Sequence, residues 1–244
     1  MNASGRRVLV VGANRPAALE AVRQCVARGD RVIATAERPT RVPALTDLAV
    51  DVPALTVLPL DPTDPPTVRS VVASAADRFG ALDLVIYGGI DAQPLAAHGE
   101  PPRDARLDTL QPGGLAEAFL HQAALPLVVL RALVSLLAQG EAPRVLVLSS
   151  WLGSIGGKTQ GGDYALCASL AGLHMLLRAF AHDVRERGIV VTVGNPGPLK
   201  TEIEGPAFKV PVERAVAGML AACEETTEEE SGRFVDWTGA GRGW

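Results

Sequence analysis

Residues Arg7–Gly29 read RVLVVGANRPAALEAVRQCVARG and join a short β-branched run to a longer amphipathic one. The first part, Arg7–Val11, has the length and composition of a buried strand. Gly12 then supplies a turn residue, and Ala17–Arg28 has the composition of a helix that begins after Pro16. A buried strand followed closely by a helix is the first half of a βαβ unit, so this stretch favours a parallel sheet.

The same alternation continues along the chain. Further strands are expected at Arg31–Thr35, Leu55–Leu60, Leu82–Ile86, Arg144–Ser149, Ile189–Val193 and Gly232–Val235. Further helices are expected at about Pro65–Phe79, Gly114–Ala138, Tyr164–Glu186 and Pro211–Glu225. The Pro- and Gly-rich piece Pro94–Pro112 is interpreted as a loop over one end of the sheet. The predicted fold class is therefore α/β, a doubly wound parallel sheet of about seven strands with helices on both faces, and residues 1–244 are expected to form a single domain.

Composition limits what the chain can do. Its 244 residues are 48% hydrophobic and 20% charged, as in globular domains, and its net charge is −4 with no long basic run, which argues against binding to nucleic acid. Cys25, Cys167 and Cys223 are widely spaced and form no CxxC motif, so we expect reduced thiols, no metal site and a cytoplasmic location. We expect no signal peptide and no membrane span, since no uninterrupted apolar run reaches about 18 residues.

Five segments carry a family resemblance. The stretch VVGANRPAALEAVRQCVARG resembles a TGANRGIG strand–turn–helix motif, and LPLDPTD resembles an LDVTD motif. The pair Ser149-Ser150 resembles serines that end a central strand, NPGPLKTE resembles a PGxxxT segment, and the closing SGRFVDWTG…GW completes the order. Together they resemble the short-chain dehydrogenase/reductase (SDR) family, in its C-factor/sniffer-like carbonyl reductase branch. The resemblance covers nearly the whole chain and implies a Rossmann-like fold.

In that family a glycine-rich turn brings the cofactor diphosphate against N–H groups at the start of the first helix. The resemblance assigns cofactor contacts to Gly12, Asn14, Arg15, Asp61 and Thr201. Here the second and third glycines of the motif are replaced by Pro16, which has no N–H, and by Ala18, whose methyl group is expected to intrude where the backbone must come close. Pro16 is also simply a good first residue for a helix. We expect no NAD(P) binding, or only weak binding.

Two positions bear on the choice of nucleotide. Glu37 stands where the branch usually has arginine, and it would repel a 2′-phosphate and favour NAD over NADP. Arg38 blurs that choice, and a solvated Glu37–Arg38 pair is equally consistent with the sequence. Asp61 matches an aspartate that contacts adenine in relatives, or else it belongs to a helix start capped by Thr63 or Asp64.

The stretch Gly161–Met175, GGDYALCASLAGLHM, resembles the active-site helix of the family, which carries Tyr-x-x-x-Lys. In relatives the Tyr exchanges a proton, and the Lys lowers the pKa of the Tyr and holds the nicotinamide ribose. The long spacing after the serine that is typical of the branch places Leu166 and Leu170 at these positions. The alternative register places Tyr164 and Ala168 there. Neither register supplies the lysine.

Leucines replace this chemistry with hydrocarbon. Leu166, Leu170, Leu173 and Leu177 recur at helix spacing and predict one apolar stripe. Without the tyrosine, an unpaired buried lysine would cost several kcal/mol, so the joint absence of both groups is physically consistent.

A few polar side chains remain as candidates for chemistry. Ser150 keeps the type and place of the family serine, which orients a substrate carbonyl. Gln122 stands where relatives have the asparagine of a proton relay, and the adjacent His121 is a candidate base or simply a surface histidine. Tyr164 and Tyr87 are further candidates; Tyr87 lies in a strand end, IYGGI, that is one residue shorter than the family's NNAGI. A Ser150/His121 nucleophile–base pair is disfavoured because no third, orienting carboxylate is evident.

The resemblance and its gaps predict an SDR-fold protein that has lost ordinary NAD(P)H-dependent carbonyl reduction. One role is a non-catalytic subunit, a homodimer or a heterodimer with an active SDR paralogue, joined through Gly114–Ala138 and Tyr164–Glu186. The other is a cofactor-independent cyclase, isomerase or lyase acting on an apolar, polyketide-like small molecule. The alternative is an atypical NAD(P)H-dependent ketoreductase that uses Ser150 and a substitute proton donor.

Overall fold

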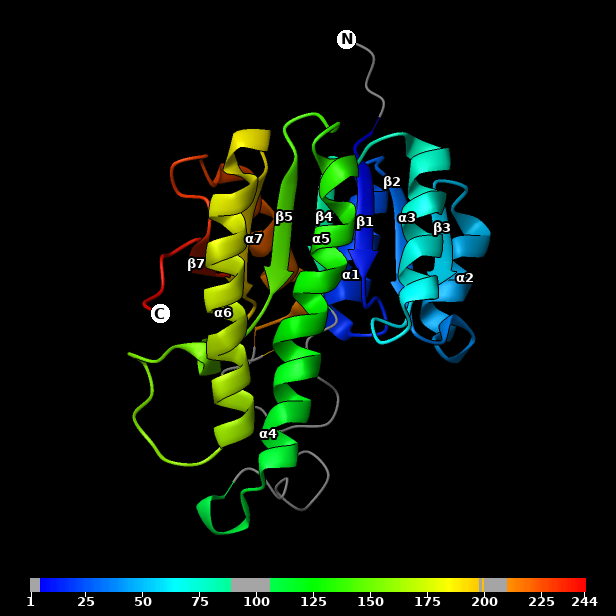
Figure 1. The fold of residues 1–244 in the computed structure, drawn as a ribbon. Coiled ribbons are helices and arrows are strands. Elements are labelled where there is room, and N and C mark those ends of the chain that lie inside the picture. The colour runs from blue at the N-terminus through cyan, green and yellow to red at the C-terminus, as the bar shows by residue number, and fades with distance from the viewer. Residues whose placement is uncertain (1–4, 89–105, 198, 200–209) are drawn as a thin grey trace.

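The computed structural model describes residues 5–88, 106–197, 199 and 210–244, and its strands form one parallel sheet in the order β3-β2-β1-β4-β5-β6-β7 (Figure 1). The strands are β1 (Arg7–Val11), β2 (Arg31–Ala36), β3 (Leu55–Pro59), β4 (Leu84–Tyr87), β5 (Arg144–Leu148), β6 (Val190–Asn195) and β7 (Arg233–Asp236). The central strand β1 pairs with both β2 and β4, so that Val8 lies opposite Val32 on one side and Leu84 on the other. The predicted doubly wound α/β fold is confirmed.

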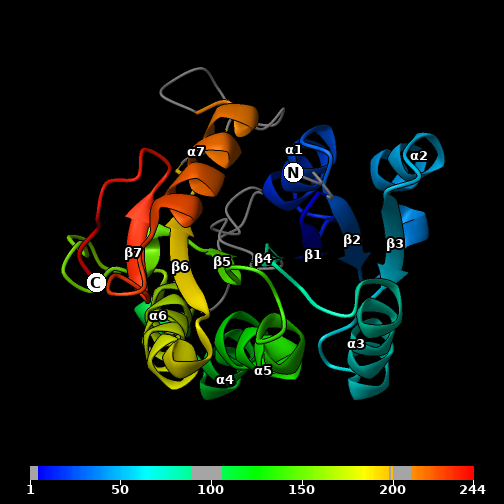
Figure 2. The ribbon, with the colours of Figure 1, turned by 90° about the horizontal axis from the view of Figure 1, so that it is seen from above.

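Helices cover both faces of the sheet (Figure 2). They are α1 (Pro16–Ala27), α2 (Pro43–Asp51), α3 (Pro65–Phe79), α4 (Pro112–Phe119), α5 (Leu125–Leu137), α6 (Tyr164–Val184) and α7 (Val212–Glu225). Helices α3, α4, α5 and α6 lie on one face, and α1, α2 and α7 lie on the other (Figure 2). Successive strand residues alternate between the two cores: Leu9 belongs to the core under α3, α5 and α6, whereas Val8 and Val10 belong to the core under α1 and α7. Burial on both faces explains why the strands read as continuous apolar runs.

Most predicted elements lie close to their expected boundaries, and those of β1 and α3 agree at both ends. Helix α2 was not expected. It begins at Pro43 and is only 9 residues long; Leu45 is buried and Leu48 and Ala49 are half-buried, so its apolar stripe is short and gives a weak signal in sequence. The expected loop over Pro94–Pro112 falls mainly outside the described residues, and its end, Pro112, starts α4.

The long helix expected at Gly114–Ala138 is interrupted. A π-helical turn, η5 (Leu120–Ala124), separates α4 from α5 and contains both His121 and Gln122. Pro126 supplies the physical reason, because it has no N–H to donate to the carbonyl of Gln122, four residues earlier. Such turns change the direction in which neighbouring side chains point, and they are frequent at functional sites.

Two helical runs, Pro112–Leu137 and Tyr164–Arg187, are long and apolar enough by composition to cross a membrane. Within these runs, α5 and α6 pack on the sheet, where α5 buries Leu130 and Leu133 and α6 buries Leu173, whereas α4 extends beyond the ends of the strands (Figure 1) and buries no residue. The hydropathy of α5 and α6 is therefore that expected of helices that line the core of an α/β domain.

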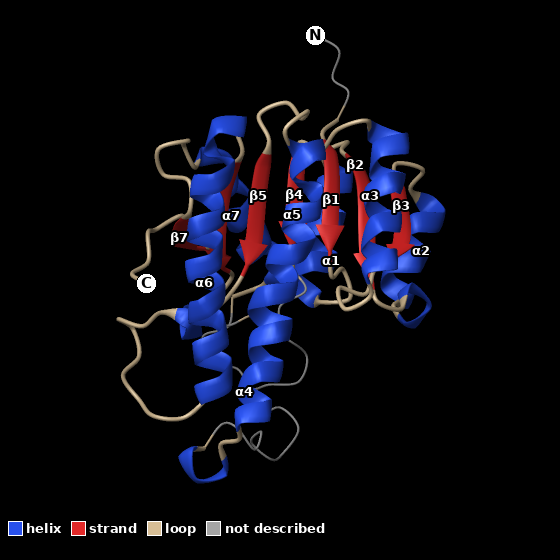
Figure 3. Ribbon diagram, viewed as in Figure 1, coloured by secondary structure: helices blue, strands red, loops and turns tan. Residues whose placement is uncertain are grey.

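The strands all end at the same edge of the sheet, where their arrowheads lie in Figure 3. The residues that directly follow β1, β4 and β5 therefore come together at this edge: Gly12, Gly88 and Ser149. In doubly wound sheets ligands bind beyond the carboxyl ends of the strands, at the point where the strand order reverses. Here that point lies between β1 and β4.

Candidate functional site

The turn after β1 keeps the backbone shape of a nucleotide-binding turn. Gly12 has a φ of +79°, which favours glycine, and the Arg15 N–H closes the turn onto the Gly12 carbonyl at 3.0 Å. Asn14 is exposed and Arg15 is half-buried. Helix α1 then starts at Pro16 with no side-chain cap, so the N–H groups of its first turn have no intrahelical acceptor. Proline removes one of those donors, and the rest of the turn is intact.

The Ala18 methyl group does not obstruct this turn. Ala18 is 0% exposed, and a Cβ placed on Gly88, after β4, would lie only 2.5 Å from the Ala18 Cβ. The methyl group therefore points inward, between helix and sheet, into space that Gly88 leaves open. The close approach that Ala18 makes is therefore to strand β4, and its effect on diphosphate binding stays a prediction.

The nucleotide-selectivity positions lie on the surface beside this turn. Glu37 and Arg38 follow β2 and form an exposed ion pair, with the Arg38 Nε 3.6 Å from the Glu37 Oε1. The Asp61 Oδ1 accepts hydrogen bonds from the N–H of Thr63 at 2.8 Å and from its hydroxyl at 2.6 Å. Asp61 therefore orders its own turn before α3, whose N-cap, Asp64, makes no side-chain cap bond. Thr201 lies outside the described residues.

Helix α6 directs the two family positions toward the sheet. Leu170, Leu173 and Leu177 are all 0% exposed, and Leu166 is half-buried against the same core, which confirms the apolar stripe. In the alternative register Ala168 is exposed. A Cβ on Gly153 would come within 2.9 Å of the Leu170 backbone carbon, so α6 packs directly on the segment that follows Ser150. The position of the family lysine is occupied by closely packed hydrocarbon.

Ser150 lies just beyond β5 and is buried, and its Oγ accepts a hydrogen bond of 3.3 Å from the Leu152 N–H. It is the N-cap of the short helical turn η6 (Trp151–Gly153). A serine hydroxyl in this position can orient a substrate oxygen, but it does not by itself supply a proton at neutral pH.

The histidine that lies beside this serine pair is His174, not His121. The Ser149 Oγ and the His174 Nε2 are 2.8 Å apart, and both residues are 2% exposed. Burial lowers the pKa of His174 to about 4, so the ring is neutral at physiological pH. Its Nδ1 has no hydrogen-bond partner among the described residues. Among the described residues no carboxylate is hydrogen-bonded to the ring, and both side chains are buried, so the pair joins the end of β5 to α6 and is not arranged as a nucleophile and base.

An aromatic cluster closes the outer side of His174. Its ring centroid lies 4.5 Å from that of Phe234 and 5.4 Å from that of Trp244. The Gly156 N–H donates to the Trp244 carbonyl at 2.9 Å, and the Ser154 hydroxyl donates to the Gly243 carbonyl at 2.8 Å. The segment around Trp244 thus fastens the loop that follows Ser150.

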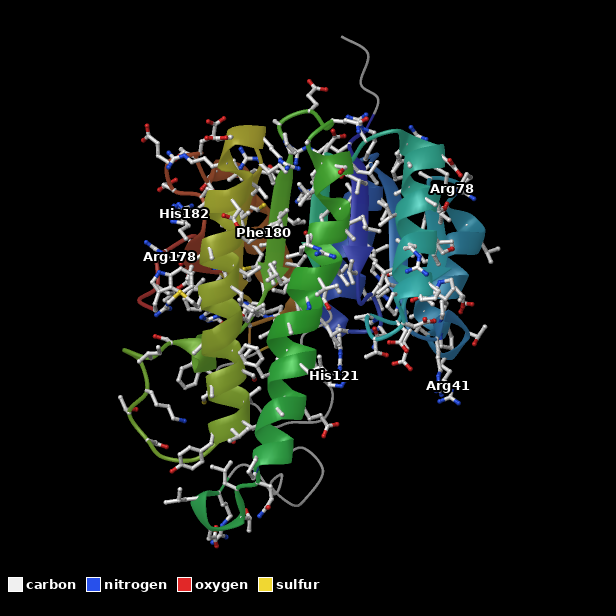
Figure 4. The ribbon with its side chains drawn as sticks, viewed as in Figure 1. Arg41, Arg78, His121, Arg178, Phe180 and His182 are labelled. Atoms are coloured by element: carbon white, nitrogen blue, oxygen red, sulfur yellow. The ribbon has the colours of Figure 1, made fainter. Side chains whose placement is uncertain are left out.

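The other polar candidates are dispersed. His121 is exposed and projects away from α6 (Figure 4), and no hydrogen bond joins it to the buried Ser150. Gln122 and Tyr164 are half-buried. Tyr87 is buried in the core under α3, α5 and α6, and this burial raises its pKa above its ordinary value. Across residues 5–88, 106–197 and 210–244 no group of His, Cys, Asp and Glu side chains is arranged to hold a metal ion.

Comparison with known proteins agrees with this architecture. The family model described as short chain dehydrogenase matches residues 6–210. The C-signal protein of Myxococcus xanthus is 36% identical over 130 residues, which are 53% of this chain and 78% of that protein.

Two solved structures resemble nearly the whole chain. An NADPH-bound carbonyl reductase from chicken fatty liver has a TM-score of 0.85 and 29% identity, over 98% of this chain and 99% of that one. The carbonyl reductase Sniffer of D. melanogaster has a TM-score of 0.86 over 97% of this chain and 98% of that one; at 21% identity it supports the fold alone.

Proposed function

This chain belongs to the short-chain dehydrogenase family, in its C-factor/sniffer-like branch, and we propose that it no longer carries out ordinary NAD(P)H-dependent carbonyl reduction. The observation that carries the proposal is helix α6. Leu166 and Leu170 occupy the sheet-facing positions at which relatives have Tyr and Lys, and Leu170 is 0% exposed. A leucine side chain neither donates a proton nor supports a charge, so neither Leu166 nor Leu170 can perform the acid–base step of the family reaction.

The described residues suit the diphosphate part of a nicotinamide cofactor better than its nicotinamide ribose. The Gly12 turn retains the shape that would receive a diphosphate, less the N–H that Pro16 lacks. At the other end, the position that the resemblance assigns to the ribose-holding lysine carries Leu170, which is 0% exposed and belongs to the apolar core. We therefore propose no NAD(P) binding, or only weak binding. The NADPH in the chicken carbonyl reductase is a property of that relative.

The first role we propose is that of a non-catalytic subunit. Helices α4, α5 and α6 lie side by side and expose apolar side chains: Phe119 by 44%, Val128 by 47% and Met175 by 68%. A surface of this kind suits a second copy of the chain or an intact SDR paralogue, because contiguous exposed apolar side chains mark interaction sites. In this role the chain acts in the cytoplasm and stabilises its partner.

The second role is a cofactor-independent enzyme, a cyclase, isomerase or lyase, that binds an apolar small molecule at the carboxyl edge of the sheet. Ser150 and Gln122 would then orient the substrate, with Tyr164 or His121 as proton carriers. One observation keeps a residual reductase as an alternative: Ser150 remains at the end of β5 and within reach of this edge. That alternative requires Tyr164 or water as the proton donor.

A reduction assay tests the proposal. Wild-type protein is mixed with NADH or NADPH and a panel of ketones, in parallel with Leu166→Tyr/Leu170→Lys and with the same double variant carrying Pro16→Gly. We expect no turnover by the wild type, which has Leu166 and Leu170, and none by the double variant, which still has Pro16 in the cofactor turn. Turnover by the wild type would refute the proposal, and robust turnover by the double variant would show that Pro16 matters less than we infer. Purification of the protein from its native cells separates the two roles: a second SDR chain that purifies with it supports the subunit role, and a protein that purifies without one supports the enzyme role.

A further inference from the structure

Lys158 and Cys167 form a close polar pair outside the site described above. The Lys158 Nζ lies 3.3 Å from the Cys167 Sγ, and it also donates a hydrogen bond of 2.9 Å to the carbonyl of Gly162. Cys167 lies near the start of α6, where its N–H donates to the Asp163 carbonyl at 2.8 Å. The segment before α6 therefore folds back over the start of the helix and holds an amine against a sulfur.

The other two cysteines lie in a different environment. Cys25 in α1 and Cys223 in α7 are buried, and burial raises their pKa to about 12 and about 11 respectively. Such buried thiols are chemically inert. Cys167 is only half-buried and Lys158 is exposed, so small solutes can reach this pair. The chain thus provides one accessible thiol and two internal controls.

We propose that Lys158 and Cys167 form a covalent nitrogen–sulfur bond when the protein is oxidised by a hydroperoxide. First, the Cys167 sulfur attacks a peroxide oxygen. The S–O bond forms, the O–O bond breaks, and the departing oxygen takes up the thiol proton, so that sulfur is oxidised to a sulfenic acid and the peroxide is reduced. The Lys158 amine, after giving its extra proton to water, then attacks the sulfur. The S–N bond forms, the S–O bond breaks, and water leaves with one amine hydrogen.

The geometry favours the second step. Sulfenic acids condense with nitrogen nucleophiles, and a nucleophile already held in contact reacts far faster than one free in solution. The Gly162 carbonyl keeps the amine in place before the sulfur is oxidised. The product ties the loop at Lys158 to the start of α6, one residue after Leu166, without involving any nicotinamide nucleotide.

Mass spectrometry of the full chain after treatment with hydrogen peroxide tests the proposal. The expected product is lighter than the untreated protein by two hydrogens, its Lys158 and Cys167 peptides are joined, and the bond is reversed by a thiol reductant. Titration of native protein should show one reactive thiol before oxidation and none after it. The oxidised protein, once denatured, should still show the two thiols of Cys25 and Cys223.

Matched variants separate this bond from simple oxidation. Lys158→Arg keeps the positive charge but offers a guanidinium in place of a nucleophilic amine, so its product should be heavier by one or more oxygens and contain no joined peptides. Cys167→Ser should form no joined peptides and should gain oxygen only at methionines such as the exposed Met175, whereas Cys25→Ser should form the bond as the wild type does. A wild-type product in which the Cys167 peptide itself carries added oxygen and separates from the Lys158 peptide, or joined peptides in Lys158→Arg, would overturn the proposal. Neither result depends on whether the protein binds NAD(P).

Discussion

The first βα unit and helix α6 lie on opposite faces of one sheet, and they differ in how much of the family site they keep. The first unit retains the Gly12 turn and the close approach of α1 to the sheet, with Pro16 as its main departure. Helix α6 carries buried and half-buried leucines along its core-facing side, and we propose that two of them, Leu166 and Leu170, stand where relatives have Tyr and Lys. The backbone that receives a nucleotide can therefore persist where the side chains of the reaction do not, because fold and function depend on different atoms.

A substitution of Leu170 tests the difference between α6 and the first βα unit most directly. Leu170→Lys buries an ammonium with no partner among the surrounding leucines, and we expect it to lower the free energy of unfolding by about 3–5 kcal/mol. Ala168→Lys, two residues away in the same helix but exposed, should change it by less than about 0.5 kcal/mol. Urea unfolding measures both. Equal stability of the two variants would reveal a solvated polar space at position 170.

The buried Ser149–His174 pair, which joins the end of β5 to α6, predicts that the stability of the protein depends on pH. The pKa of His174 is about 4 in the folded protein and near 6.5 in the unfolded chain, so below pH 6.5 the unfolded chain binds a proton that the folded one does not. Stability should therefore fall by about 3 kcal/mol as the pH drops from 7 to 4. The pKa values of Asp83 and Asp236 are lowered, so these carboxylates contribute only at still lower pH.

His174→Phe is the matched variant, because phenylalanine preserves an aromatic ring beside Phe234 and Trp244 while removing the titrating group. Its unfolding free energy should vary much less than that of the wild type over this pH window. Parallel curves for the two proteins would mean that the ring is protonated or solvated in the folded state.

The first unit can be tested through the contact between Ala18 and Gly88. Gly88→Ala adds a methyl group 2.5 Å from the Ala18 Cβ, and overpacking of this kind should cost about 1–3 kcal/mol. Ala18→Gly should relieve most of that cost, which gives a coupling energy of similar size in a double-mutant cycle. Additive effects would mean that the helix shifts to absorb the methyl group.

The smallest expected effect concerns the cofactor. Pro16→Gly restores one N–H at the start of α1, and we expect it to strengthen binding of NADH or NADPH by about tenfold, since a charge-assisted hydrogen bond is worth roughly 1.5–3 kcal/mol less the cost of a flexible residue. Fluorescence titration of wild type and variant measures the change. If Pro16→Gly leaves the affinity for NADH and NADPH unchanged, the weak nucleotide binding must come from α6 and not from the turn at Pro16.

Much of the fold could be predicted from the sequence because its signals are local. Each strand is an apolar β-branched run, and leucines at helical spacing predict α6. Helix α2 was missed because Leu45 is its only buried residue. The π turn in the long helix had a signal in Pro126, whose missing N–H frees the carbonyl of Gln122.

The site was harder to predict because its contacts are long-range. Ser149 and His174 meet only when α6 packs on the segment around Gly153. His174 had one signal, because it lies at helix spacing on the leucine stripe, four residues after Leu170, but nothing in the sequence pointed to Ser149 as its partner. The same holds for Ala18: its neighbour Gly88 was recognised as part of an unusual strand end, but the contact between them follows from three-dimensional packing.

Calorimetric titration of NADH and NADPH into the full chain tests the central claim most directly. Our account predicts dissociation constants of about 1 mM or weaker for both nucleotides. A dissociation constant of about 1 µM for either one would contradict it and revive the alternative of an atypical NAD(P)H-dependent ketoreductase.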